Sequence, residues 1–254
     1  MEITNSLIKY IASLSQKKNR EAVGCFAAEG TKCVRDTWDY FNCRMIVATK
    51  AWYEQFGHSG HLDKIVFANR QQMQRMSQFS TASEVIAIYD IPKYDISDSD
   101  IESNINIVLD NVQDPGNLGT IIRIADWFGI KNIFCNKTTV DVFNHKVIQA
   151  TMGAISRVQV HYCDLEELMA AHRNIPIYGT FLDGDNIYES TLSDSCFIVF
   201  GNEGKGISND VSKLVTKRLL IPSYPKGANT SESLNVGMAT AITIGEFRRR
   251  SMIK

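Results

Sequence analysis

The chain has 254 residues, of which 44% are hydrophobic and 22% are charged, a balance typical of a folded globular protein with one large domain or two ordinary ones. This composition excludes an intrinsically disordered chain and a collagen-like repeat. The 27 Lys and Arg residues nearly balance the 28 Asp and Glu residues, so a polyanionic partner would have to bind a local basic patch.

The cysteines and the apolar segments bear on the cellular compartment. Six cysteines, namely Cys25, Cys33, Cys43, Cys135, Cys163 and Cys196, stand at irregular spacings with no C-x-x-C pair. This spacing predicts reduced, mostly buried thiols and no zinc site. No run of about 18 apolar residues and no signal-peptide pattern occurs, so we expect a cytoplasmic protein without a membrane partner.

The first ninety residues predict a small α/β unit. The pattern indicates a helix over 7–14, a helix from Thr31, and strands over 25–28, 45–48, 64–68 and 85–89. Residues 90–102 follow, with five acids, a proline and two serines, and show no helix or strand period. We place the domain boundary in this acidic segment.

The remaining residues repeat the alternation with stronger signals. Strands are expected over 105–109, 132–135 and 175–180 and near Val158 and Phe197, with helices from Asn117, over 144–153 and from Leu234. Continuous apolar strands separated by helices predict a largely parallel sheet covered on both faces. Ligands of such sheets bind at the carboxyl ends of the strands.

The first segment that carries chemistry is 109–125, where a buried strand runs into Asp114-Pro-Gly-Asn117 and then into a helix. Turn chemistry makes Asn117 a candidate N-cap. A buried stripe is predicted for Leu118, Ile121, Ile122, Ala125 and Phe128. Arg123 lies on another face, where its guanidinium could bind a phosphate or ribose, or could pair with Asp126 three residues later.

The second segment is 197–207, an apolar strand that ends in Gly201-Asn-Glu-Gly-Lys-Gly206. Its glycines would let another molecule approach the main chain closely. The loop matches neither the P-loop register nor the dinucleotide fingerprint, and a plain strand-to-helix turn is the alternative interpretation.

The third segment is 219–247, where a strand enters a long polar loop that leads to the last helix. Ser231 or Ser233 is expected to cap this helix, and Arg248, Arg249 and Arg250 complement its dipole and are available for an acidic partner. Its predicted buried stripe consists of Leu234, Met238, Ala241, Ile242 and Gly245.

Together the three segments resemble the SpoU (TrmH-like) family of RNA ribose 2′-O-methyltransferases in the SPOUT superfamily. The family motifs N-x-x-D-P-x-N-x-G-x-x-x-R, G-N-E-G-x-G and I-P…S-L-N-V all stand intact, over 111–123, 201–206 and 221–236. The resemblance extends to 144–154 and 26–32 and so covers nearly the whole chain.

The resemblance implies a two-domain α/β architecture. Residues 1–92 would form a small α/β RNA substrate-binding domain that resembles a ribosomal protein, and 93–104 an acidic linker. Residues 105–254 would form the SPOUT methyltransferase domain, with a deep trefoil knot and a homodimer interface. The cofactor would be S-adenosyl-L-methionine, held by Thr180, Gly201, Asn202, Gly204, Ile221 and Leu234, with no metal.

The resemblance also implies the reaction and its residues. The methyl group would go to a ribose 2′-hydroxyl, in ribosomal RNA by family analogy, with transfer RNA as the alternative. The expected catalytic residues are Asn117, Arg123, Glu203, Ser233 and Asn235. A guanidinium stays protonated, so we expect Arg123 to clamp ribose and phosphate rather than to act as a base. Ser233 and Asn235 would orient, and Glu203 would fix the loop.

RNA binding is expected on the first domain. Residues 3–20 contain Lys9, Lys17, Lys18 and Arg20 with no acid, a local patch that suits an RNA backbone, although a solvated helix end explains it as well. We predict Lys17, Lys18, Arg20 and Lys32 as RNA contacts, and Lys146 and Arg157 as an extension of the track.

Three further interpretations complete the sequence analysis. His58 and His61 are three residues apart, but no further ligand cluster supports a metal site. Trp38, Trp52 and Trp127 are too scattered for a stacking platform and are expected to pack in cores. The rival function is a non-catalytic RNA-binding or ribosome-assembly protein that kept the fold.

Overall fold

Two compact units make up the chain, and each is described separately. The computed structural model describes residues 3–57, 64–225 and 231–252. Contacts between Cα atoms group 1–93 with 141–156 in the first unit, and 94–140 with 157–254 in the second. The pair His58 and His61 lies outside the described residues.

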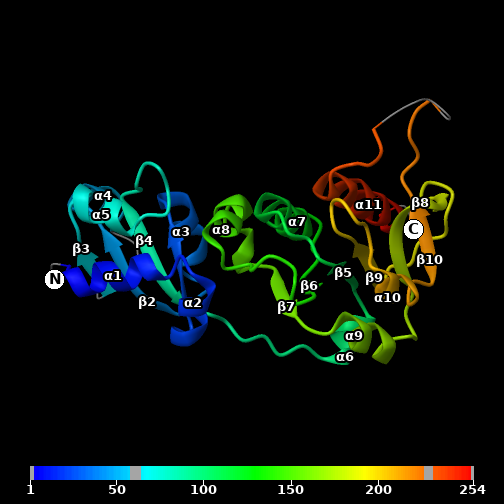
Figure 1. The fold of residues 1–254 in the computed structure, drawn as a ribbon, viewed down its shortest axis with the longest axis horizontal. Helices are drawn as coiled ribbons and strands as arrows, with labels where there is room; N and C mark the ends of the chain where they lie inside the picture. Colours follow the sequence, from blue (N-terminus) through cyan, green and yellow to red (C-terminus); the bar gives the residue numbers. More distant parts are fainter. Residues whose placement is uncertain (1–2, 58–63, 226–230, 253–254) are drawn as a thin grey trace. The chain divides into compact units, whose positions relative to one another are not determined.

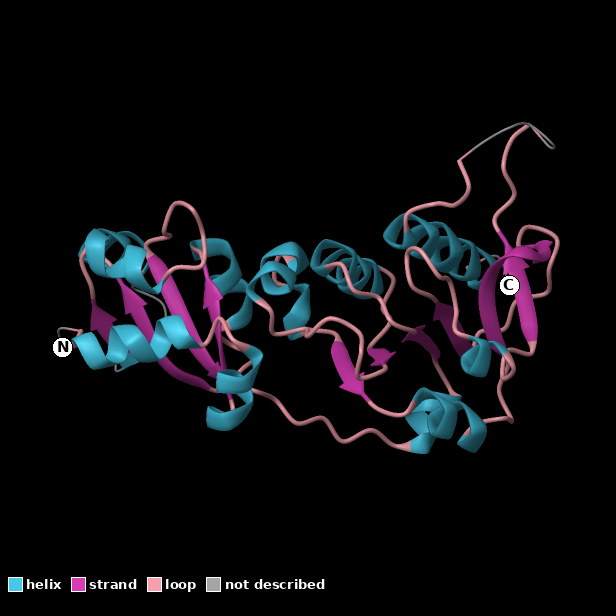
Figure 2. Cartoon of the chain, viewed as in Figure 1, coloured by secondary structure: helices cyan, strands magenta, loops and turns pink. Residues whose placement is uncertain are grey.

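The first unit is a four-stranded sheet with helices on both faces (Figures 1 and 2). Its strand order is β1-β4-β2-β3, in which β4 runs antiparallel to β1 and β2, and β2 runs parallel to β3. The elements are α1 (Asn5–Ser13), α2 (Lys17–Val23), β1 (Cys25–Glu29), α3 (Thr31–Thr37), β2 (Cys43–Ala48), α4 (Lys50–Phe56), β3 (Ile65–Phe67), α5 (Arg70–Met76), β4 (Val85–Asp90), α8 (His145–Thr151) and the short 3-10 helix η2 (Ala154–Ser156).

The side chains of β4 point alternately to the two faces of the sheet and so divide the core of this unit into two parts. Ile86 and Ile88 join a cluster with the buried residues of α1 and α5. Tyr89 points to the opposite face and packs against Phe26 and Phe41, with ring centroids 5.6 Å apart in both pairs. Because successive strand residues point to opposite faces, one strand serves both layers of helices.

The segment 141–156 lies in the first unit, although the sequence assigned it to the 105–254 domain. Its contacts explain the difference: the ring of Phe143 is 4.5 Å from that of Phe26, and Asp141 forms an ion pair with Arg20. Gly153 adopts φ +91°, and a Cβ at this position would lie 2.6 Å from the Cβ of Asp36. Close approach and a left-handed backbone both require glycine here.

The second unit is a six-stranded parallel sheet in the order β10-β8-β9-β5-β6-β7, which confirms the expected parallel sheet. Its elements are α6 (Asp98–Glu102), β5 (Ile105–Leu109), α7 (Pro115–Trp127), β6 (Asn132–Cys135), β7 (Gln159–Tyr162), α9 (Leu165–Ala171), β8 (Ile177–Asn186), β9 (Cys196–Phe200), α10 (Asn209–Ser212), β10 (Lys217–Leu220) and α11 (Val236–Ser251).

Helices cover both faces of this sheet (Figure 1). One face packs with α6, α9 and α10 in a cluster that includes Ile101, Met169 and Val211. The other face is covered by α7 and α11, and the ring of Phe247 from α11 lies 5.1 Å from that of Tyr178 on β8. Strands β5 and β9 have every residue buried, as expected of central parallel strands.

Two local expectations differ from the structure. The acidic segment is not wholly irregular, because Ser97 caps the short helix α6 with Asp98 and Asp100 in its first turn. Those carboxylates favour a helix N-terminus, which a search for apolar periodicity does not detect. The three arginines at the end of α11 are engaged within the unit: Arg248 donates to the carbonyl of Phe128, and Arg249 and Arg250 bind Glu246.

The buried face of α11 is not the predicted one. Leu234 and Met238 are 49% and 57% exposed, while the helix buries Val236, Gly237, Thr240, Thr243, Ile244, Glu246 and Phe247. Two of the inward polar residues are hydrogen-bonded there, because Thr240 Oγ1 donates to the carbonyl of Val236 and Glu246 binds Arg249 and Arg250, whereas Thr243 Oγ1 has no partner among the described residues. Trp127 was also expected in a core and is 85% exposed, whereas Trp38 and Trp52 are buried.

Candidate active site

The sheet order places a switch point between β5 and β9. The chain leaves β5 toward α7 and β6 on one side, and leaves β9 toward α10 and β10 on the other. Such a point opens a crevice at the carboxyl ends of the two strands. The first two motif segments therefore meet here, since each of them directly follows one of these strands.

Side chains that the sequence did not single out fix the turn after β5. Asp110 is 3% exposed, and its two oxygens accept hydrogen bonds from the Ser208 amide at 2.7 Å and from Asn136 Nδ2 at 2.8 Å. Asn136 Oδ1 in turn accepts from the Asn111 amide at 3.1 Å. The sequence contains a pattern that could have identified them: Asp110 directly follows the buried strand β5, and Asn136 directly follows β6. Parallel sheets place functional polar groups at such positions.

The glycine-rich loop after β9 is a closed turn. The amide of Asn202 donates to the carbonyl of Gly206 and the amide of Gly206 donates back, both at 2.9 Å. Asn202 Oδ1 accepts from the amides of Gly204 and Lys205, each at 3.0 Å. A Cβ at Gly201 would lie 2.1 Å from the carbonyl carbon of Gly206, so only glycine fits at this position.

Three of the predicted catalytic residues form one hydrogen-bonded cluster. Asn117 Nδ2 donates to Glu203 Oε1 at 2.9 Å, and Asn235 Nδ2 donates to Asn117 Oδ1 at 2.9 Å. Glu203 also faces the amides of Gln113 and Asp114 at 3.5 and 3.4 Å. The cluster thus joins the turn before α7, the glycine-rich loop and the start of α11.

Both helix caps in this region differ from the predicted ones. Asp114, not Asn117, caps α7, because Pro115 takes the first helical position with its fixed φ. Asn235, rather than Ser231 or Ser233, caps α11, and its Oδ1 accepts from the amides of Gly237 and Met238 at 2.9 and 3.3 Å. Asn235 therefore holds the helix with its oxygen and Asn117 with its nitrogen.

Arg123 stands apart from this cluster. It is exposed on α7, and within the described ranges no hydrogen bond or ion pair involves its guanidinium. The alternative partner Asp126 instead accepts from Arg157 Nε at 2.8 Å and Nη2 at 2.7 Å. This pairing also occupies Arg157, which had been expected to extend an RNA track.

A cavity of about 790 Å³ lies beside the cluster. All six predicted cofactor-binding residues line it, together with Glu203 and Ser233; the six are Thr180, Gly201, Asn202, Gly204, Ile221 and Leu234. Phe181, Leu182 and Lys205, which sequence reasoning did not select, also belong to its walls.

The predicted RNA contacts have unequal surroundings. Lys18 is exposed, Lys17 lies 3.8 Å from Glu21, and Lys32 pairs with Asp36. Arg20 is 3% exposed, and its Nη1 donates to the carbonyls of Leu14 and Ser15 at 2.7 and 2.9 Å. Its prediction as an RNA contact was wrong, because this face of α2 is turned inward and both terminal nitrogens of the guanidinium bind groups of the first unit.

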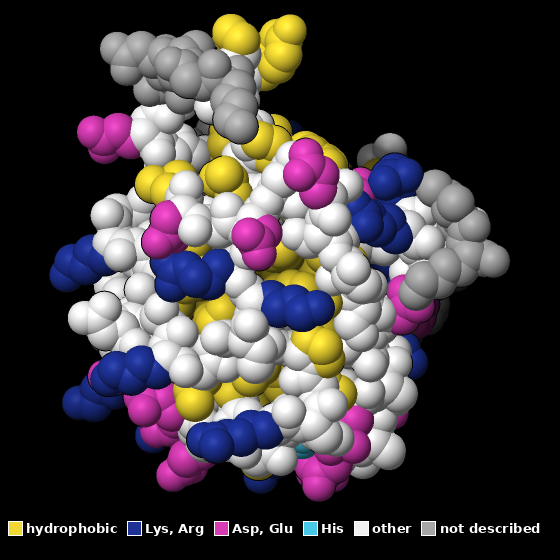
Figure 3. All heavy atoms as spheres, turned by 90° about the vertical axis from the view of Figure 1, so that its right-hand side faces the viewer, with side chains coloured by type: hydrophobic (Ala, Val, Ile, Leu, Met, Phe, Trp, Pro, Cys, Tyr) yellow, Lys and Arg dark blue, Asp and Glu magenta, His cyan; other side chains and the backbone are white. Residues whose placement is uncertain are grey.

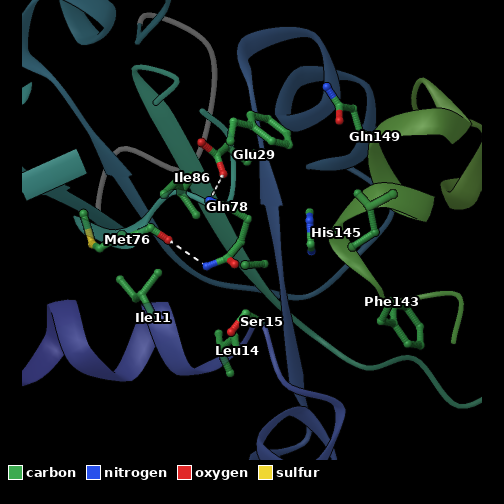
Figure 4. A pocket seen from close by; sticks show the side chains of 13 residues that line it. Ile11, Leu14, Ser15, Glu29, Met76, Gln78, Ile86, Phe143, His145 and Gln149 are labelled. Atoms are coloured by element: carbon green, nitrogen blue, oxygen red, sulfur yellow. Dashed lines mark hydrogen bonds between the residues drawn. The ribbon is translucent and has the colours of Figure 1, made fainter. Parts of the chain in front are cut away.

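A second cavity, in the first unit, is too small for a substrate (Figure 4). Its volume of about 20 Å³ has room for roughly one water molecule. Gln78 and His145 point toward it, and burial lowers the pKa of His145. We assign this cavity no ligand.

Surface charge, metal ligands and apolar helices were each considered as signs of a further site. Figure 3 shows one face of the second unit, where Lys and Arg side chains alternate with Asp and Glu side chains. Among the described residues no three His, Cys, Asp or Glu side chains are arranged to hold a metal ion. No helix in the described ranges is long and apolar enough to span a membrane.

Comparison with known proteins matches both parts of the chain. The model of the SpoU rRNA methylase family matches residues 104–245, and that of the MRM3-like substrate binding domain matches residues 5–87. The 23S rRNA (guanosine(2553)-2'-O)-methyltransferase RlmP of Bacillus subtilis is 35% identical over 147 residues, 56% of this chain and 57% of its own length.

Solved structures are similar over nearly the whole chain. A TrmH-family protein from Porphyromonas gingivalis has a TM-score of 0.89 at 37% identity and covers 98% of this chain and 100% of its own. The AdoMet-bound rRNA methyltransferase from Sinorhizobium meliloti has a TM-score of 0.85 at 28% identity, with 98% of each chain covered. The SpoU rRNA methylase family model matches more than half of the residues of this chain, and the chain therefore belongs to that family.

Proposed function

We propose that this protein is an RNA methyltransferase that uses S-adenosyl-L-methionine to methylate a ribose 2′-hydroxyl in ribosomal RNA. The observation that carries the proposal is the cavity at the carboxyl ends of the strands, with the Asn117–Glu203–Asn235 cluster beside it. The names of its relatives, RlmP and the Sinorhizobium rRNA methyltransferase, support the substrate and the cofactor.

The cavity suits a cofactor of this kind. Its volume falls in the range of pockets that enclose drug-sized ligands. Bare backbone at Gly201 and Gly204 allows close approach, while Leu219, Leu220 and Ile221 provide an apolar wall. Glu203 contributes a carboxylate to the cavity lining, and a carboxylate favours a cationic group such as a sulfonium electrostatically.

The cofactor supplies an electrophilic methyl group, so the chain has to bind and orient the ribose hydroxyl. The Asn117 amide is held at both ends, by Glu203 and by Asn235, and so keeps one orientation. Glu203 receives donors from two loops and fixes their spacing. The guanidinium of Arg123 donates to ribose and phosphate and lowers the cost of the alkoxide, and Ser233 orients the acceptor from the cavity wall.

RNA recognition by the first unit belongs to the same proposal. Lys9, Lys17, Lys18 and Lys32 are exposed there, and each has a flexible cationic side chain suited to phosphate contacts. The match of residues 5–87 to a substrate binding domain supports this assignment.

A trefoil knot and a homodimer complete the proposed architecture. After β10 the chain returns to the middle of the sheet, where Asn235 binds Asn117 and α11 packs on α7; this return supports a knot. Three apolar side chains are exposed in this part of the unit: Trp127 at the end of α7, Met238 in the first turn of α11, and Leu234 just before α11. We assign these exposed side chains to contacts with a second copy of the chain, because Leu234 also lines the cavity and a partner there would close the site.

Transfer of labelled methyl from S-adenosyl-L-methionine to purified ribosomal and transfer RNA tests the function. RNA from cells lacking the protein serves as substrate. Label on a ribose 2′-oxygen of ribosomal RNA is expected. Label on transfer RNA alone would change the substrate class, and no label together with no cofactor binding by calorimetry would favour the non-catalytic RNA-binding function.

The Arg123→Ala variant is the matched control. Since Arg123 makes no hydrogen bond or ion pair within the described residues, its loss should change the free energy of unfolding by less than about 0.5 kcal/mol. Methylation should fall at least about 100-fold with cofactor affinity unchanged. Loss of cofactor affinity would show that Arg123 acts elsewhere than on the RNA.

A further inference from the structure

Helix α7 carries one basic residue, Arg123, and one acidic residue, Asp126, three positions apart. Residues at this spacing are neighbours on the surface of a helix, so a carboxylate at 126 lies within reach of a guanidinium at 123. An ion pair between oppositely charged side chains at this spacing is favourable. The helix by itself therefore favours a pair that would engage the guanidinium of Arg123.

The structure gives Asp126 a different partner. Arg157 donates from Nε to Oδ1 of Asp126 at 2.8 Å and from Nη2 to Oδ2 at 2.7 Å, so one guanidinium occupies both carboxylate oxygens. Two parallel hydrogen bonds of this kind are stronger and more directional than a single contact. Arg123 is left exposed, with neither a hydrogen bond nor an ion pair to any residue that the structure describes.

Strand pairing brings Arg157 to this helix across 31 positions of sequence. Strands β6 and β7 run parallel with Asn132 opposite Gln159, and the Gln159 amide donates to the carbonyl of Lys131 at 2.7 Å. Strand β6 follows α7 after a short turn, and Arg157 precedes β7 directly. The register of the sheet therefore places Arg157 beside the last turn of α7.

The last turn of α7 explains why Asp126 requires a cation. The carbonyl end of a helix carries a partial negative charge, so a carboxylate there is unfavourable unless a cation compensates it. Arg157 supplies this cation. The turn is also fixed from α11, because Arg248 donates from Nε to the carbonyl of Phe128 at 2.9 Å. Without Arg157, the cation that α7 itself offers to Asp126 is Arg123.

We propose that Arg157 is a positioning residue for methylation, because by binding Asp126 it keeps the guanidinium of Arg123 free for the RNA. This inference rests on the proposed function, in which Arg123 binds ribose and phosphate. A guanidinium paired with Asp126 does not present the same donors to a phosphate. An uncompensated carboxylate on the same face of α7 also repels the RNA backbone.

Single-turnover methylation of ribosomal RNA by the full-length protein, at saturating cofactor, tests this role. Arg157→Met should lower the rate about threefold, since an exposed ion pair on a helix reduces the fraction of free Arg123 by about that factor. Asp126→Asn removes the competing charge and should react like the wild type. The double variant with Arg157→Met and Asp126→Asn should recover the wild-type rate. Calorimetry should give the same cofactor affinity for all of these proteins.

A second background separates this role from a structural one and from a general loss of charge. In Arg123→Ala the guanidinium is absent, so adding Arg157→Met should slow the reaction no further. Lys213→Met is the matched control, because it breaks the exposed pair with Asp210 and removes one positive charge from the same unit. It should react like the wild type. Urea unfolding verifies that each variant is folded.

The outcomes distinguish this inference from the proposed function. A wild-type rate in Arg157→Met overturns the inference, and so does an equal loss in Asp126→Asn, which would make the pair structural. A loss that persists in the Arg123→Ala background also overturns it, because the effect would then not pass through Arg123. No methylation by the wild type overturns the proposed function instead. If Arg157→Met does not fold, Arg157→Gln, which keeps a neutral donor, is compared in the same way.

Discussion

Asn235 Nδ2 donates a hydrogen bond to Asn117 Oδ1 at 2.9 Å, across 118 positions of sequence. Asn235 is at the same time the N-cap of α11, and Asn117 is simultaneously a donor to Glu203. One side chain therefore links the start of the last helix to the first turn of α7. Any shift of α11 would be transmitted to the orientation of the Asn117 amide.

Replacing Asn235 separates its two roles. Asn235→Ala should lower the free energy of unfolding by about 1 kcal/mol through the lost cap, and kcat by about 100-fold through the misoriented Asn117. Asn235→Ser keeps a good capping residue but cannot reach Asn117 in the same way, so it should unfold like the wild type and remain slow. Urea unfolding and steady-state methylation measure the two effects. Wild-type kcat in Asn235→Ser would mean that the bond to Asn117 is dispensable.

Arg20 should matter for stability rather than for RNA affinity. Arg20→Met leaves Asp141 without its partner and the carbonyls of Leu14 and Ser15 without a donor, so we expect a loss of about 3 kcal/mol. Lys18→Met, an exposed neighbour, should change stability by less than about 0.5 kcal/mol.

Tryptophan fluorescence during urea unfolding reports this difference, because the first unit buries Trp38 and Trp52. Filter binding then measures RNA affinity of the folded variants. A stable Arg20→Met variant that has lost RNA binding would contradict the structural role and return Arg20 to the RNA surface.

Glu246 makes stability depend on acidic pH. Hydrogen bonds from Arg249, and also from Arg250, hold its pKa down to about 2 from the usual 4.5. The folded state therefore binds this proton less readily than the unfolded state, and the stabilisation present above pH 4.5 is lost as the pH falls toward 2. We expect a loss of about 2 kcal/mol, below the full value of the shift because solvent screens Arg249.

Thermal unfolding between pH 2.5 and 6 measures this dependence, with Glu246→Gln as the comparison. The variant should start less stable at pH 6 and lose less stability on acidification than the wild type does. Parallel pH curves for the two proteins would show that another carboxyl group controls the acid transition.

Trp127 should anchor the proposed homodimer. A Trp that is 85% exposed is the type of residue that dominates an interface when a partner buries it. Trp127→Glu should convert a dimer into a monomer in light scattering, while Tyr188→Glu, elsewhere on the same unit, should not. A wild-type protein that is monomeric at micromolar concentration would refute the dimer.

Local sequence predicted most of the fold of the second unit. The strands over 105–109 and 132–135 have the expected bounds, because a short, mostly apolar run between polar turns has few alternatives in a parallel sheet. Of the predicted stripe, Leu118, Ile121, Ile122 and Ala125 are buried, whereas Phe128 is the C-cap of α7 and only partly buried. In α11 the same reasoning selected the wrong face, because Thr240 and Glu246 are satisfied inside and Met238 is left outside.

What the sequence by itself determined is the local part: the parallel α/β pattern, the glycine-rich turn and the motif residues, each of which depends on neighbours a few positions away. Only the tertiary structure decided that Arg20 forms an ion pair with Asp141 and that 141–156 joins the first unit. It also decided that Asn117 forms hydrogen bonds with both Glu203 and Asn235. The physical reason is that the chemistry of a charged group or an amide does not depend on its position in the chain. Its role depends on whether the fold buries it and on which group, distant in sequence, becomes its hydrogen-bond or ion-pair partner.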